Sequence, residues 1–208
     1  MFYFISTPRV IKMLYPDCLW GVNTNEKVLY LTFDDGPHPS ATPFVLEQLK
    51  QYKARATFFC IGKNVTDNFE LYKRVINEGH RVGNHTFSHL NGWKTGDKEY
   101  VDDVLKAKEL IDSDLFRPPY GRITKFQLKL LHGEKNSLKT AMWDVLSGDF
   151  DTDITGEDCF LNVVNSAKRG SIVVFHDSAK AFDRLQYTLP RVLEYYADKG
   201  YEFRGLPK

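Results

Sequence analysis

The stretch that decides the fold reads VLYLTFDDGP and runs from Val28 to Pro37. Its first six residues, Val28–Phe33, are apolar or β-branched in succession and do not alternate with polar residues. Strands with this pattern are covered on both faces, as in parallel sheets flanked by helices. Two aspartates follow at once, and Gly36-Pro37 then turns the chain. The stretch predicts a buried parallel strand that ends in a polar loop.

The same alternation of elements recurs to the end of the chain. Further strands are predicted at Thr57–Ile61, Arg81–Gly83, Leu115–Arg117, Thr140–Val145, Ile172–Phe175 and Tyr201–Phe203. Six amphipathic helical patterns lie between the strands, around 44–52, 69–76, 100–111, 126–131, 160–167 and 185–196. Strands and helices in alternation require parallel strands joined by right-handed crossovers. The pattern predicts an α/β protein, and it allows both a nearly closed barrel and an open doubly wound sheet.

Length and composition limit the organisation of the chain. At 208 residues the sequence is expected to form a single domain, 1–208, with residues 1–26 as an N-terminal extension packing on it. The 28 Lys and Arg residues balance 27 Asp and Glu residues, which argues against a nucleic-acid partner. No segment has the roughly 18 apolar residues of a membrane span, and the N-terminus lacks signal-peptide features. A cytoplasmic protein, or one peripheral to the membrane, is therefore expected.

Polar clusters follow five of the predicted strands, at the point where each strand ends. In chain order they are Asp34-Asp35, His85 with His89, Arg117–Tyr120, Asp144 with Asp149, and His176-Asp177. Parallel α/β proteins build their sites at the carboxyl ends of strands, where the loops converge. We therefore expect these clusters to form one functional site.

A metal centre is the chemistry that the histidine pair favours. If residues 85–89 form a helical turn, the rings of His85 and His89 project from one face and can bind one ion. A carboxylate from another strand end would complete a set of two histidines and one carboxylate, with positions left for water and substrate. The alternative is a pair of surface histidines on a helix. Their position after a strand, with an Asp pair available, favours the metal site.

The Asp34-Asp35 pair offers two carboxylates at this end of the sheet. On an extended chain the two side chains point in opposite directions, but the Gly36-Pro37 turn can bring both to one locus. One can then bind the metal while the other accepts a proton from the metal-bound water. The residues alone do not assign these two roles between Asp34 and Asp35. There are two non-functional alternatives. In the first, the Asp pair serves only to cap the turn, and in the second, His176 is an ordinary histidine of the core.

These motifs carry a family resemblance. Thr32–Pro37 (TFDDGP), His85-Thr86-x-x-His89, Arg117–Gly121 (RPPYG) and the strand ending in His176 resemble the successive motifs of the polysaccharide deacetylases. This group is also known as the NodB-homology family or carbohydrate esterase family 4. The resemblance covers about Leu29 to Asp177 in the family's order. It implies a distorted, incomplete (β/α)7-type barrel of parallel strands.

The resemblance also implies roles for single residues. Asp35, His85 and His89 would hold one divalent metal ion, zinc or else cobalt or nickel. Asp34 would be the general base, and Arg117 would position it.

On the leaving-group side, the resemblance implies His176 as the general acid. Asp149 would orient and charge this histidine, although Asp144 is near enough in sequence to compete for that role. The backbone N–H of Tyr120 would contribute to the oxyanion site, with Pro119 and Trp143 beside the substrate. Phe150 stands where the family usually has Trp, and Val174 stands where it has Leu.

The implied activity is metal-dependent removal of acetyl groups from N-acetylated, less readily O-acetylated, sugars of a polysaccharide or oligosaccharide, with release of acetate. One alternative is a related metal amidase that acts on a non-polysaccharide C–N bond. Another is a catalytically silent carbohydrate-binding protein on the same fold. Both of these would be expected to lack part of the motif set, which is complete here. The sequence does not choose among chitin oligomers, peptidoglycan, a lipid-linked sugar and xylan, and it leaves the oligomeric state open.

Overall fold

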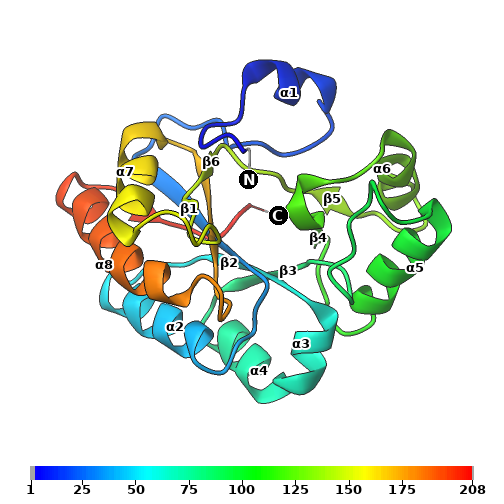
Figure 1. Cartoon of the computed structure of the whole chain (residues 1–208), viewed down its shortest axis with the longest axis horizontal. Helices are drawn as coiled ribbons and strands as arrows, with labels where there is room; N and C mark the ends of the chain where they lie inside the picture. Colours follow the sequence, from blue (N-terminus) through cyan, green and yellow to red (C-terminus); the bar gives the residue numbers. More distant parts are fainter. Residues whose placement is uncertain (1–2, 208) are drawn as a thin grey trace.

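The computed structural model describes residues 3–207, which form one curled parallel sheet with helices on its outer side (Figure 1). The strands are β1 (Val28–Asp34), β2 (Thr57–Cys60), β3 (Arg81–Asn84), β4 (Leu115–Phe116), β5 (Lys139–Thr140), β6 (Val145–Leu146), β7 (Ile172–His176) and β8 (Glu202–Phe203). Their order is β5-β4-β3-β2-β1-β7-β6, and β8 pairs with the start of β1. The predicted incomplete barrel of parallel strands is confirmed.

Helices cover the outside of the sheet. They are α1 (Arg9–Leu14), α2 (Ala41–Gln51), α3 (Gly62–Asp67), α4 (Phe69–Asn77), α5 (Asp97–Lys108), α6 (Lys125–His132), α7 (Gly156–Ser166) and α8 (Phe182–Asp198). The six predicted helices are present, and the short α1 and α3 are additional. Between residues 3 and 207 no helix combines the length and the apolar character needed to cross a membrane.

The predicted strand Thr140–Val145 is wrong, because this segment forms two short strands, β5 and β6, at opposite edges of the sheet. Arg117 donates hydrogen bonds to the carbonyls of Ala141 (3.0 Å) and Met142 (2.9 Å) in the linker between them. The backbone there is held by a side chain and does not continue one strand. Since five residues of chain reach at most about 18 Å, the two edges of the sheet lie close together.

The N-terminal segment runs through the gap between these two edges. Ser6 forms an antiparallel bridge with Val145 of β6, and Leu19 forms a parallel bridge with Ala141, next to β5. The N–H of Leu146 also donates to the carbonyl of Ile5 at 2.8 Å. Figure 1 shows this part of the chain, in blue, with α1 on the outside beside β6. The gap of the incomplete barrel is therefore bridged by residues that precede the first strand.

Strand β1 is buried along its whole length and separates two apolar clusters. Leu29, Leu31 and Phe33 pack into the larger cluster, together with side chains of α2 and α8. Val28 and Tyr30 belong to a smaller cluster that includes Leu206 of the C-terminal segment. Because side chains alternate along a strand, Thr32 and Asp34 lie on the same face as Val28 and Tyr30. The strand thus carries Asp34 to the inner face of the sheet at its carboxyl end.

Candidate active site

Three predicted ligands come together beyond the ends of β1 and β3. One possible ligand atom from each of Asp35, His85 and His89 lies within 4.8 Å of the others. Asp35 Oδ1 is 3.2 Å from His89 Nε2 and 3.7 Å from His85 Nε2. The structure therefore brings the three predicted ligands together at one place.

Residues 85–89 do not form the helical turn that would place both rings on one face. The segment is an irregular loop, in which Thr86 has a φ of 63° and His89 a φ of 58°. The left-handed region is disfavoured for a β-branched residue such as Thr86, so the surrounding contacts must impose it. In this loop the two rings lie 5.2 Å apart, with His85 buried and His89 partly exposed.

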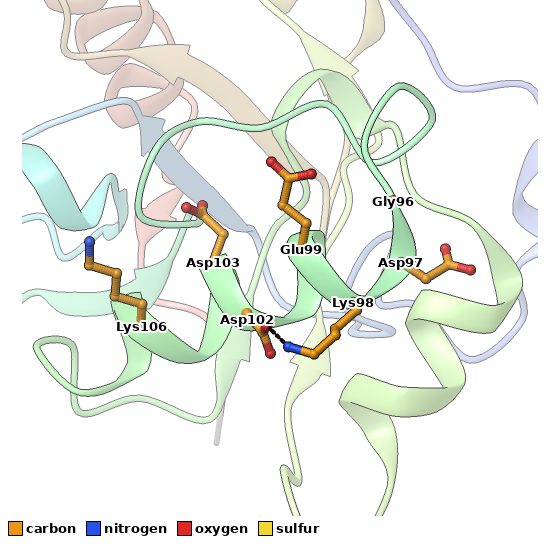
Figure 2. Close-up of a pocket in the computed structure, with 7 residues that line it drawn as sticks. All are labelled: Gly96, Asp97, Lys98, Glu99, Asp102, Asp103 and Lys106. Atoms are coloured by element: carbon orange, nitrogen blue, oxygen red, sulfur yellow. Dashed lines mark hydrogen bonds and ion pairs between the residues drawn. The ribbon is translucent and has the colours of Figure 1, made fainter.

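Two neighbouring side chains hold that loop. Asn84 Oδ1 accepts a hydrogen bond from the N–H of Thr86 at 2.8 Å. Asp103 Oδ2 accepts from the successive N–H groups of residues 87 and 88, both at 2.9 Å. Figure 2 shows Asp103 on α5, among the charged side chains that line a surface hollow along this helix. That hollow contains none of the three metal-site residues. Asp103 thus connects α5 to the site through the loop.

The turn after β1 places Asp35. Asp35 has a φ of 80°, and its carbonyl accepts a hydrogen bond from Asn64 Nδ2 at 2.7 Å. The N–H of Gly36 donates to the buried Asp177 at 3.1 Å, and Thr42 Oγ1 donates to the other oxygen of that carboxylate. A Cβ at position 36 would lie 2.1 Å from Asp177 Oδ2, so only glycine fits this close approach. Asp177 therefore fixes the turn, a role that the sequence did not reveal.

The protonation states suit a divalent cation. Burial lowers the pKa of His85 to about 4, which leaves the neutral, metal-binding imidazole. Its Nδ1 makes a 2.8 Å hydrogen bond to the carbonyl of Arg117, so Nδ1 carries the proton and Nε2 is free toward Asp35. Although burial alone would raise it, the neighbouring His89, His176 and His85 lower the pKa of Asp35.

The cluster also contains an unsatisfied acceptor. Asp35 Oδ1 is buried and accepts no hydrogen bond from the described residues. Such an atom is costly unless a cation or water meets it. Two neutral imidazole nitrogens and one carboxylate oxygen are a donor set that zinc and similar ions accept. The residues therefore fit a divalent metal ion.

Asp34 and Arg117 form a buried ion pair next to the cluster. Arg117 Nη1 lies 2.7 Å from Asp34 Oδ1 and donates also to Thr32 Oγ1 at 2.7 Å. The Arg117 side chain is fully buried, and its guanidinium lies 4.0 Å from the centre of the Phe59 ring. The guanidinium also donates two hydrogen bonds to carbonyls of the linker between β5 and β6. This arrangement fixes the position of the Asp34 carboxylate.

His176, at the end of β7, pairs with Asp149. The Asp149 carboxylate binds both His176 Nδ1 and the His176 N–H, each at 2.8 Å. Asp144, the other candidate partner, instead binds Lys12 and Ser171. Burial lowers the pKa of His176, but the charge and hydrogen bond of Asp149 outweigh it and raise that pKa to about 9. The geometry thus assigns Asp149, and not Asp144, as the partner of a protonated imidazole.

Replacing Asp149 by Asn is expected to lower the pKa of His176. The charge that holds the proton would be gone, while burial would still disfavour the imidazolium. In the general-acid role that the family resemblance implies, His176 must be protonated, so the rate of acetate release should fall off at lower pH than in the unchanged protein, where Asp149 raises the pKa of His176 to about 9. The pH dependence of kcat/KM measures this, because it reports the pKa values of the free protein. Asp144→Asn is the matched control, and an equal shift in that variant would contradict the assignment.

The remaining predicted residues complete one wall of the site. Pro119 and Tyr120 lie in a 3-10 turn, η1 (Pro119–Gly121), where Tyr120 has a φ of 58°. Tyr120 is 54% exposed, and its ring lies edge-on to that of His89, with 4.7 Å between the ring centroids. Trp143 packs so closely on Gly121 that a Cβ there would lie 2.6 Å from the indole. The wall therefore joins the turn after β4 to the linker before β6.

Fold and side chains together define a barrel-type α/β protein with a candidate metal-dependent active site at the carboxyl ends of its strands. The family model for polysaccharide deacetylase matches residues 21–132, more than half of the sequence. The chain belongs to the polysaccharide deacetylase family, which confirms the resemblance drawn from its motifs.

Individual relatives agree with this assignment. A peptidoglycan-N-acetylglucosamine deacetylase of Bacillus cereus is 38% identical over 190 residues, which cover 88% of each chain. A chitooligosaccharide deacetylase of a Bradyrhizobium strain is 34% identical and covers 91% of this chain and 93% of its own. The crystal structure of the Bc1960 peptidoglycan N-acetylglucosamine deacetylase superposes with a TM-score of 0.87. It has 31% identity and covers 97% of this chain and 95% of its own.

Proposed function

We propose that the protein is a metal-dependent deacetylase that hydrolyses the N-acetyl group of a sugar in a glycan chain and releases acetate. The observation that carries the proposal is the cluster of Asp35, His85 and His89 around an unsatisfied carboxylate oxygen, beside the buried Asp34. The relatives named above, which act on peptidoglycan and chitooligosaccharides, support N-acetylglucosamine as the reacting sugar.

The two aspartates take different roles in this proposal. Asp35 faces both imidazoles and serves as a ligand, whereas Asp34 is held by Arg117 and serves as the general base. A divalent ion in this cluster would polarise the acetyl carbonyl and lower the pKa of a bound water. Asp34 accepts the proton of the attacking water.

Two further groups act on the tetrahedral species that this attack forms. The Tyr120 N–H donates to the oxygen that becomes negative, an effect typically worth about 3 kcal/mol per donor. His176, kept protonated by Asp149, gives its proton to the nitrogen as the amide C–N bond breaks. The products are acetate and a sugar with a free amine. A dedicated acid is needed because an unprotonated amine leaves poorly.

Chelation tests the proposal directly. Removal of bound metal should lower acetate release from N-acetylglucosamine oligomers by roughly a thousandfold, since the ion contributes several kcal/mol of transition-state stabilisation. Adding back Zn, Co or Ni should restore it. Metal content is measured by elemental analysis on the same samples. Undiminished acetate release from metal-free protein would overturn the proposed function.

A further inference from the structure

Two loops of the site are bonded to each other beyond the metal cluster. Residues 90–95 follow His89, and residues 121–124 follow Tyr120. The N–H of Gly92 donates to the carbonyl of Arg122 at 3.1 Å, and a Cβ at position 92 would lie 2.5 Å from that oxygen. The two loops therefore pack at backbone contact.

A buried glutamine joins the same two loops. Gln127, on α6, is fully buried, and its Nε2 donates to the carbonyl of Gly92 at 2.9 Å. Its Oε1 accepts from the N–H of Thr124 at 3.0 Å. Both ends of the amide are used, one on each loop. This bridge keeps the loops in a fixed relative position.

Trp93 belongs to the first of these two loops, and much of its surface is exposed to solvent. Trp93 is 56% exposed, although its Nε1–H is satisfied by the carbonyl of Ile123 at 3.0 Å. The guanidinium of Arg122 lies 4.1 Å from the ring centre. A large aromatic ring that is exposed yet held by a hydrogen bond and a cation–π contact is a preorganised binding surface.

The position of Trp93 relates it to the reacting centre. It follows His89 by four residues, so the two α-carbons are at most about 14 Å apart. Arg122 follows Tyr120 by two residues, and the exposed Tyr120 ring contacts His89. Tyr120, which contacts His89, and Trp93, which contacts Arg122, therefore lie within a distance that an oligosaccharide can span.

We propose that Trp93, with Arg122, is a subsite that binds a sugar residue near the one being deacetylated. This inference rests on the proposed function. The C–H face of a pyranose ring packs on an aromatic ring, and the guanidinium donates to the hydroxyl groups at the sugar's edge. The subsite favours chains that are long enough to reach from the metal cluster to the indole.

Trp93→Ala tests the subsite on N-acetylglucosamine oligomers from the dimer to the hexamer. For the longer oligomers KM should rise about tenfold with kcat unchanged, as expected for the loss of one stacking contact. The dimer should react as before. Trp93→Phe keeps an aromatic face and should retain most of the affinity. Leu110→Ala, an exposed apolar residue just beyond the opposite end of α5, is the control.

A binding measurement separates the subsite from the activity. Calorimetric titration of the pentamer into Asp34→Asn protein, with and without Trp93→Ala, should show the same tenfold weakening. Equal affinity and equal KM in the Trp93→Ala and Leu110→Ala proteins would overturn the subsite. A fall in kcat and metal content in Trp93→Ala would also overturn it, since the indole would then act through loop structure. Pentamer binding that depends on Trp93, together with no acetate release by the protein that keeps Asp34, would refute the proposed function alone.

Discussion

Asp34→Asn is expected to lower kcat for acetate release by about 10²–10⁴-fold while the protein keeps its metal. The amide cannot accept the proton of the attacking water, so general-base assistance of that size is lost. Its oxygen can still accept the hydrogen bond that Arg117 Nη1 now gives to Asp34 at 2.7 Å, which should keep the guanidinium in place. The buried guanidinium loses its counter-charge, so this variant should also be less stable than the unchanged protein, and denaturant titration checks that it remains folded under the assay conditions. Acetate release and metal content, measured on the same preparation, check both parts.

Asp35→Asn is the matched control, because it makes the same replacement of a carboxylate by an amide at the adjacent residue. Asp35 lies against both imidazoles, so this variant should lose metal as well as activity. Equal metal occupancy in the two variants would reverse the assignment of ligand and base.

Arg117→Met is expected to lower the free energy of unfolding by about 3–5 kcal/mol, which is typical when one partner of a buried ion pair is removed. The change leaves the buried Asp34 without its cation and the carbonyls of Ala141 and Met142 without a donor. Denaturant titration measures the loss. Arg204, exposed and paired only with Glu26 and Glu202 among the described side chains, gives the control Arg204→Met, which should change little.

The double variant Asp34→Asn with Arg117→Met tests the reason for that loss. With both charges removed, much of the stability should return, because no unpaired buried charge remains. A double variant as unstable as Arg117→Met alone would show that packing of the guanidinium, and not the ion pair, is what matters.

The sequence predicts the parts of the fold that depend on long apolar runs. Strands β1, β2, β3 and β7 fall where their composition places them, and their ends locate the site. The linker between β5 and β6 was not predictable, because its break is made by Arg117, a residue distant in sequence. The choice of Asp149 over Asp144 likewise needed the register of β6 beside β7.

The supporting side chains of the site were harder to predict. Asp177, Asn64 and Asp103 act on backbone groups of loops and have no motif of their own. Residues with positive φ at the site, Asp35, Thr86, His89 and Tyr120, also give no signal, since none is glycine. Tertiary contacts impose these conformations, which store strain where ligands must be held in place.

The N-terminal segment that bridges the edges of the barrel has a consequence for biosynthesis. Ser6 leaves the ribosome long before its partner Val145, and Gly21 long before Ser171. The apolar residues of this segment therefore lack their native partners while most of the chain is being synthesised. Contacts between such distant positions are slow to form, so the closing of the barrel is a late event in folding. Nascent chains that stop before β6 would leave Ser6 and Gly21 without their partners Val145 and Ser171.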